Sequence, residues 1–351
     1  MKKLLLSLFA AIGILSLQSC SEDFEVAAPY KPMTIVFGIL NMSDTAHYIR
    51  IQKSFLDEHK NAFDMAKVSD SNFYKESDLM VVVKEMSGST QTAPPIPLTR
   101  VDMNQEGYPK DSGTFFKSPN YAYKFKWAIN PSRTYRLVIT NKATNITDSS
   151  EIRVVDAGRL DLSGGNIFPK RLSFPLSQSG QVLMLFLDQS IVGNVDYVEA
   201  AIRFRWVNKN TTTNQVTRDS ADYTFATISG DALKDLKLQT EASNLYRFLA
   251  DAMKPAPIGV DRYMDSCRIL LLGTGKEYIN YLTTSQIQSS GLTSGQIKPL
   301  YTNIMGKDVF GLYTSEAKKY IPNAYIDDIT LNALKTDPLT TSLRIMGRPT
   351  P

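Results

Sequence analysis

The sequence contains few of the residues that bind metals or cross-link a chain. Its 351 residues include two histidines, His47 and His59, and two cysteines, Cys20 and Cys267. Two histidines cannot form a His-rich metal cage, and two cysteines offer at most one disulfide. We therefore expect a fold that depends on its hydrophobic cores, without a metal or another cofactor.

An excess of charge of one sign is also missing. The chain has 39 Lys and Arg against 35 Asp and Glu, a formal net charge of +4. Such a balance argues against a nucleic-acid partner, and a hydrophobic content of 43% excludes intrinsic disorder. At this length we expect two domains, each large enough to bury its own core.

Long hydrophobic runs are absent apart from Leu4–Leu17, which follows the short cationic head Met1-Lys2-Lys3. The run is shorter than the roughly 20 residues that a membrane-spanning helix needs. A cationic head before a short apolar run is typical of a secretory signal. We predict that residues 1–19 form a signal peptide that is absent from the mature protein.

The segment Leu17-Gln18-Ser19-Cys20 resembles a bacterial lipoprotein box. By this resemblance Cys20 becomes the mature N-terminus and carries the lipid that anchors the protein in the outer membrane. More than one acyl chain gives stable attachment, because each methylene group that enters the bilayer contributes about 0.8 kcal/mol of binding free energy. The alternative is a plain secretory signal cut near Ser19. Loss of Lys2 and Lys3 with the signal lowers the formal charge from +4 to +2.

Residues 20–31 form an acidic tether in this interpretation. Its sequence Ser21-Glu22-Asp23-Phe24-Glu25 resembles the surface-export signal of Bacteroidota lipoproteins, which implies display on the cell surface. The alternative is a solvated tether on a protein that faces the periplasm.

The predicted fold is mainly β, and residues 32–156 form its first domain. Apolar and polar residues alternate in several short runs, as in half-buried strands. We predict strands over 33–40, 46–55, 79–86, 96–103, 121–127, 134–140 and 151–155, and a helix over 59–68. This pattern is typical of an antiparallel β-sandwich of immunoglobulin or fibronectin type.

Asp156–Lys170 has no sustained periodicity and marks the predicted domain boundary. Residues 157–351 are predicted to form a β-rich α+β domain. Its strands are expected over 181–187, 268–272 and 324–331, with a long hairpin of 197–207 and 215–225. Its helices are expected over 241–253 and 277–289, with a short helix from Ser315 that ends at Pro322. In the hairpin, Arg203 and Arg205 are predicted opposite Ile202, Phe204 and Trp206.

Two motifs suggest chemistry but fit local structure better. Gly273-Thr274-Gly275-Lys276 lacks the first glycine and the Ser or Thr of a phosphate-binding loop, so we expect a turn. Ser315-Glu316-Ala317-Lys318 matches the Ser-x-x-Lys of penicillin-recognising enzymes, but the partner motifs are missing. We expect Ser315 to cap a helix.

Other candidate residues are also interpreted structurally. His47 and His59 would have to serve any serine–histidine–acid site, but no nucleophile elbow accompanies them. Asp327-Asp328 could form a carboxylate pair only if the fold supplied the spacing. Trp127 and Trp206 lie in alternating segments and are expected in or beside a core.

Cys267 lies in Ser266–Leu272, whose apolar sequence predicts a buried strand. We expect it to be a small core residue and not a nucleophile.

The segment Tyr301–Tyr313, after a stretch such as Glu277–Leu282, resembles a Bacteroidota outer-membrane lipoprotein family of unassigned function. Genes of that family often stand beside TonB-dependent receptors of the SusC/SusD type. The resemblance implies a β-rich domain after the lipid anchor and a receptor as partner, and it implies no catalytic residue. Gly306 and Gly311 are expected at a turn and in a closely packed strand, with Phe310 and Tyr313 in the core.

The leading hypothesis is a non-enzymatic, lipid-anchored envelope protein that binds a ligand or partner and assists nutrient uptake. A surface hydrolase acting on glycan or peptide is the second hypothesis, and an acidic pair in a deep cleft would favour it. An adhesin or fibre module is the third, and open strand edges would favour it.

Overall fold

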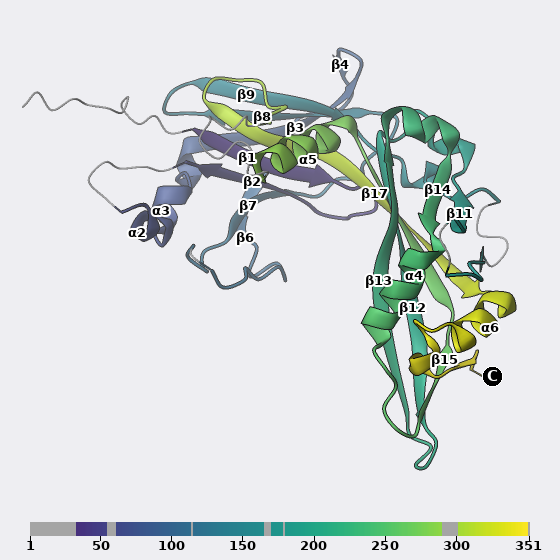
Figure 1. Cartoon of the computed structure of the whole chain (residues 1–351). Coiled ribbons are helices and arrows are strands. Elements are labelled where there is room, and N and C mark those ends of the chain that lie inside the picture. The colour runs from purple at the N-terminus through teal and green to yellow at the C-terminus, as the bar shows by residue number, and fades with distance from the viewer. Residues whose placement is uncertain are drawn as a thin grey trace, which may run out of the picture.

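The computed structural model describes residues 33–54, 61–113, 115–164, 170–177, 180–289 and 301–349. The signal peptide, the tether with Cys20, and His59 lie outside these residues. The fold is mainly β with several helices, as predicted. Figure 1 shows two lobes, with a long hairpin extending from the second.

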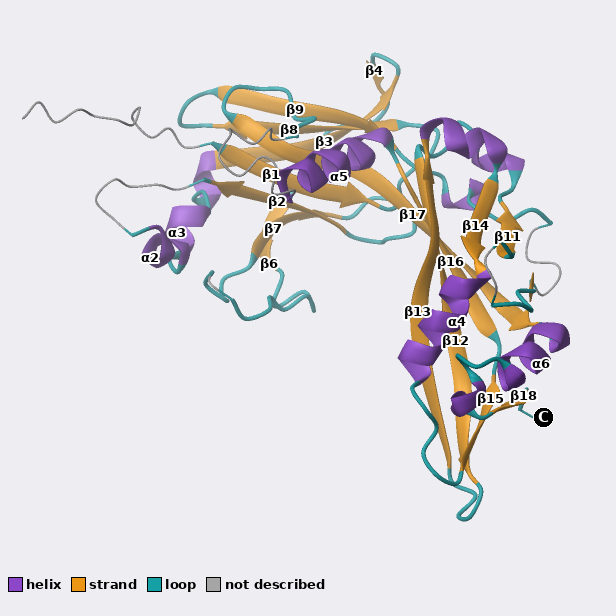
Figure 2. Cartoon of the chain, viewed as in Figure 1, coloured by secondary structure: helices purple, strands orange, loops and turns teal. Residues whose placement is uncertain are grey.

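The first lobe is a sandwich of two sheets, and Figure 2 shows its strands lying above one another. One sheet contains β1 (Thr34–Leu40), β2 (His47–Lys53), β6 (Thr99–Asp102) and β7 (Tyr121–Phe125). The other contains β3 (Leu79–Ser87), β4 (Thr90–Gln91), β5 (Ile96–Pro97), β8 (Thr134–Asn141) and β9 (Ile146–Arg153). Inward side chains of both sheets, such as Ile49 and Leu137, are fully buried between them. Alternation along each strand produces this core.

Two predicted elements of this lobe are divided. The strand expected over 96–103 becomes β5, which pairs with β3, and β6, which pairs with β7 in the other sheet. Pro97 lacks the N–H that would continue one ladder, which suits a chain that changes sheets. The expected helix over 59–68 becomes α2 (Ala62–Ala66), capped by Asn61, followed by α3 (Ser69–Asn72).

The long strand β17 (Val309–Ile326) connects the two lobes. Its first half runs parallel to β1, from Thr34 opposite Val309 to Leu40 opposite Ser315. Its second half is antiparallel to β16 (Cys267–Thr274) of the second lobe. The result is a single 11-stranded mixed sheet, which differs from the antiparallel arrangement predicted for the first lobe.

β17 also corrects the prediction for the C-terminal tail. The helix expected from Ser315 to Pro322 is strand. The strand expected over 324–331 is correct only as far as Ile326, where β17 ends, and helix α6 (Asp328–Thr336) follows. Pro322 does not end the element, because the register against β16 shifts there and Asn323 adopts a positive φ of 60°. A bulge accommodates the proline within the strand.

The predicted boundary at Asp156 also differs from the packing. Ile304, Val309 and Tyr313, far beyond it, belong to the core of the first lobe. Leu160 and Leu162, inside the expected linker, are buried in the core of the second lobe. The first lobe is therefore completed by residues from the C-terminal third of the chain.

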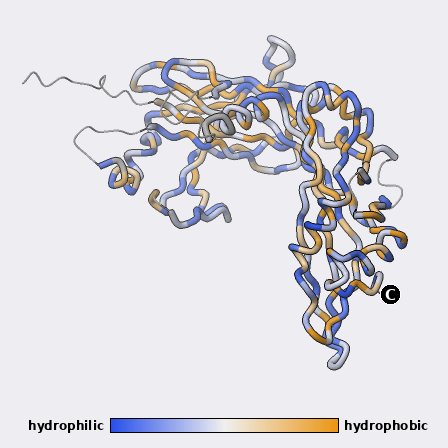
Figure 3. Tube along the Cα trace, viewed as in Figure 1, coloured by the Kyte–Doolittle hydropathy of each residue, from blue (hydrophilic) through white to orange (hydrophobic). Residues whose placement is uncertain are grey.

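The second lobe is built around the hairpin of β12 (Tyr197–Asn210) and β13 (Val216–Ser229). Its other elements are β10 (Arg171–Leu172), β11 (Val182–Phe186), β14 (Lys237–Glu241), α4 (Ala242–Met253), β15 (Val260–Met264), β16, α6 and β18 (Ile345–Gly347). Helix α5 (Lys276–Ser289) lies over β1 of the first lobe (Figure 1), where the rings of Phe37 and Tyr281 are 6.4 Å apart. Figure 3 shows hydrophobic and hydrophilic residues interleaved along the strands. Ile202, Phe204 and Trp206 face the core while Arg203 and Arg205 face outward, as predicted.

Short 3-10 helices complete the described chain, at Glu76–Asp78, Ala157–Arg159, Gln189–Ile191, Gly230–Asp235 and Thr341–Leu343. In the part of the chain that the structure describes, no helix has the length and apolar character needed to cross a bilayer.

Candidate ligand-binding face on the hairpin

The outward face of the hairpin is a candidate binding surface, here named the hairpin face. It consists of outward residues of β12, β13 and β15: Arg205, Val207, Lys209, Val216, Arg218, Ser220 and Tyr263. Val207 lies opposite Arg218 on one side and Tyr263 on the other, and Lys209 lies opposite Val216. Because side chains alternate along a strand, these groups share the face opposite the core.

Two adjoining hollows mark this face. The larger, of about 640 Å³, is lined by residues that include Val207, Lys209, Arg218, Tyr263 and Asp265. The second, of about 580 Å³, is lined by Arg205, Arg218, Ser220 and Asp265 among others. Both hollows contain Arg218 and Asp265, so together they form one elongated, open depression along the hairpin.

The cations of the face differ in how they are held. The Arg203 guanidinium, just beyond the hollows, binds Asp222 through two hydrogen bonds of 2.6 Å. Arg205 donates from Nε to the Ser266 carbonyl at 2.8 Å and from Nη2 to Ser266 Oγ at 2.7 Å. The hydrogen bonds from Arg203 lower the pKa of Asp222 below its usual value. The guanidinium groups of these two arginines are therefore already hydrogen-bonded within the protein.

Lys209 and Arg218 are held differently. Among the residues that the structure describes, neither forms an ion pair. Asp261 lies directly across from Lys209, but it binds Arg344 at 2.6 Å. The hollows therefore present two cations that are available to an anionic group.

Sequence reasoning missed most of this face. It placed Arg203 and Arg205 outside the core, and the same alternation extends to Lys209. Tyr263 and Arg218 join Lys209 only through strand pairing, and local sequence does not specify which strands pair.

The Ser-x-x-Lys motif does not form a catalytic pair, and the expectation that Ser315 caps a helix was wrong. Ser315 lies in β17, where its Oγ accepts from Val155 N at 3.0 Å and donates to the Arg153 carbonyl at 2.9 Å. Lys318 pairs with Glu316 at 2.7 Å. Residues three apart on a strand face opposite sides, so serine and lysine point away from each other.

The turn expected at Gly273–Lys276 is shorter than predicted, because Gly273 and Thr274 end β16, Gly275 alone connects the two elements and Lys276 begins α5. Gly273 packs so closely that an added Cβ would lie 2.8 Å from Val195 Cγ1. Gly273 therefore allows close packing against Val195 and Leu160 and is not part of a phosphate loop.

The other predicted residues lie in structural positions. His47 is buried with Nε2 3.1 Å from the Trp127 carbonyl, and burial lowers its pKa. Cys267 is completely buried, as predicted, and burial raises the pKa of its thiol to about 12. Asp327 accepts from Thr330 N as the N-cap of α6, while Asp328 pairs with Arg348.

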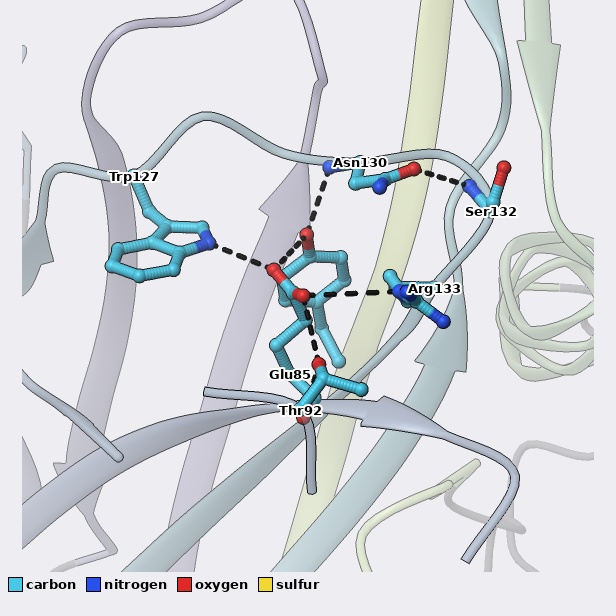
Figure 4. A network of polar contacts seen from close by, with 7 residues as sticks. Glu85, Thr92, Trp127, Asn130, Ser132 and Arg133 are labelled. Carbon is cyan, nitrogen blue, oxygen red and sulfur yellow. Dashed lines mark hydrogen bonds and ion pairs between the residues drawn. The ribbon is translucent and has the colours of Figure 1, made fainter. Parts of the chain in front are cut away.

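Figure 4 shows a polar network of the first lobe, around Glu85 on β3. Its carboxylate accepts hydrogen bonds from Trp127 Nε1 at 3.0 Å, Tyr135 Oη at 3.1 Å and Thr92 Oγ1 at 2.8 Å. Arg133 Nε lies 3.9 Å away. Burial alone would raise the pKa of Glu85, but these hydrogen bonds outweigh it and lower the pKa. The network joins β3 to β8 and places Trp127 beside the core, as predicted.

No group of three or more His, Cys, Asp or Glu side chains suited to a metal ion lies within the described ranges.

Comparison with known proteins identifies no family. No family model matches the sequence, and no curated protein matches it. One solved structure, the C-terminal globular domain of oligosaccharyltransferase from Pyrococcus abyssi, aligns at 10% identity. The alignment covers 83% of this chain and 48% of that one, with a TM-score of 0.15. This chain thus spans about half of that structure, and so low a score supports no conclusion about fold or function.

Proposed function

We propose that this protein is a lipid-anchored envelope protein, displayed on the outer membrane, that binds a ligand for a nutrient-uptake receptor. The hairpin face carries the proposal: it combines an elongated depression with two cations that no carboxylate among the described residues neutralises. Pockets that hold ligands are concave and contain a few well-placed polar groups. The ligand in this proposal is a glycan or peptide nutrient.

The position of the face supports presentation to a ligand. The tether of residues 20–31 leads into β1, which lies in the first lobe. The hairpin tip projects from the second lobe, away from β1 (Figure 1). A protein anchored through Cys20 would then hold the hairpin face away from its own attachment point. The TonB-dependent receptor remains the proposed partner on the resemblance of Tyr301–Tyr313 alone.

The anchor is tested by labelling cells with a clickable fatty acid. The wild-type protein should incorporate the label and fractionate with the outer membrane, whereas Cys20→Ser should be unlabelled. Cys267→Ala is the control because its thiol is buried, and it should label normally. Equal labelling of wild type and Cys20→Ser would contradict lipidation at this residue.

Display and partnership are tested on the same cells. Protease treatment of intact cells should remove the protein, and gentle detergent extraction should recover a TonB-dependent receptor with it. A protein that survives proteolysis while surface markers disappear faces the periplasm. Recovery without any receptor after chemical cross-linking would contradict the accessory role.

A further inference from the structure

We infer that the hairpin face binds a carboxylate-bearing polysaccharide, with Lys209 and Arg218 contacting the sugar carboxylates. The inference rests on the proposed function, because it names the ligand class of the same surface.

Charge is the first reason. Lys209 lies opposite Val216, two residues from Arg218 on the neighbouring strand, so the two cations are diagonal neighbours on one face. Side chains in this relation lie roughly 7–8 Å apart at their bases. Both line the larger hollow. A guanidinium can bind a carboxylate through two parallel hydrogen bonds, and an ammonium can bind it as a point charge.

The remaining groups of the hollow suit a hydroxyl-rich ligand. Tyr263 contributes an aromatic ring with a polar end, and Asp265 and Asn214 add hydrogen-bonding groups. Asp265 would repel a densely acidic ligand but can accept hydrogen bonds from sugar hydroxyls. The mixture of two cations and one carboxylate therefore favours a sugar chain with spaced carboxylates.

An acidic polypeptide added as a strand beside β13 is less favoured. Among the described strands, β13 pairs only with β12, so its other edge is open. That edge carries Arg218, Asp219 and Asp222 within five residues. Charged side chains on an open edge oppose the addition of a further strand.

The test uses the full lipoprotein purified in detergent and three carboxylated polysaccharides: polygalacturonate, alginate and hyaluronate. Dextran serves as a neutral glycan and polyglutamate as an acidic polypeptide. Affinity electrophoresis should show binding to at least one carboxylated polysaccharide, no binding to dextran and weaker binding to polyglutamate. Lys209→Ala and Arg218→Ala should each weaken binding about tenfold, as expected for loss of a charge-assisted hydrogen bond.

Arg247→Ala is the matched control, because this exposed arginine lies on α4, over the opposite side of the sheet. It removes the same charge and should leave binding unchanged. Tyr263→Ala should weaken binding while Tyr263→Phe retains it.

Three results would overturn the inference. They are failure of all three polysaccharides to bind, equal loss in Arg247→Ala, or polyglutamate binding as tightly as the polysaccharides. Receptor recovery from cells does not depend on these assays, so failure here leaves the proposed accessory role standing.

Discussion

Two acids of the first lobe, one half-buried and one buried, show how strongly the pKa of a side chain depends on its neighbours. Glu85 and Asp148 both lie in the first lobe, and burial by itself would raise the pKa of each. Glu85 receives three side-chain hydrogen bonds, and its pKa falls. Asp148 Oδ1 has no hydrogen-bond partner in the described structure, and the pKa of Asp148 rises. Opposite effects of pH on stability follow.

For Glu85, replacement by Gln should lower stability at neutral pH by about 1–3 kcal/mol, since charged acceptors are lost from a partly buried network. The lowered pKa means that Glu85 stabilises the fold above its unfolded-state value of about 4.5. This contribution disappears as pH falls through the lower folded-state pKa. Urea denaturation at several pH values should show a weaker acid dependence in Glu85→Gln.

Glu76→Gln is the control, because the side chain of Glu76 is 65% exposed. It should change stability by only a few tenths of a kcal/mol. A loss as large as that of Glu85→Gln would show that the effect does not come from the polar network around Glu85.

For Asp148, the effect of pH on stability has the opposite sign. Its raised pKa means that ionisation destabilises the folded state, so this contribution weakens stability as pH rises from about 3.8 through the folded-state pKa. Asp148→Asn should remove that slope and melt higher than wild type at neutral pH. Thermal melts across this range measure it, and a lower melting temperature at neutral pH would refute the prediction.

The helices and strands show where a local sequence pattern fails to predict secondary structure. The alternation in Met33–Leu40 or in the hairpin predicts strands correctly, because each strand has one buried and one exposed face. Ser315–Pro322 was mistaken for a helix because Pro322 looked like a terminator. Pairing of this segment with β16 supplies hydrogen bonds that a short isolated helix does not gain.

Within β17, position 311 must be glycine because β1 packs closely against it. It has a φ of +138°, and an added Cβ would lie 1.9 Å from the Val36 carbonyl oxygen on β1. Gly311→Ala should destabilise the protein by about 3 kcal/mol or more, because strain and a backbone clash combine. Chemical denaturation measures the loss.

Gly347→Ala separates the two causes. Gly347 has a similar φ of +144°, but nothing lies within 4 Å of an added Cβ. Its replacement should cost only the backbone strain, of the order of 1–3 kcal/mol. Equal losses at the two glycines would mean that the contact with Val36 contributes nothing.

At the scale of the whole molecule, the lobes share one sheet and are expected to unfold together. Residues 33–156 expressed alone lack β17, and with it Val309 and Tyr313 of their own core. This fragment should show no cooperative thermal transition, whereas the full protein should show one. A fragment that melts cooperatively would mean that β17 is dispensable for the first lobe.

The sequence by itself determined the β-rich class, most strand positions and the core placement of Cys267 and Trp206, and the anchor at Cys20 stays a prediction. Those conclusions depend on local alternation or on short motifs. Only the tertiary structure decided that β17 completes both lobes and that Lys209, Arg218 and Tyr263 share a face. Strand pairing joins residues far apart in the chain, and its free energy depends on the complete set of contacts.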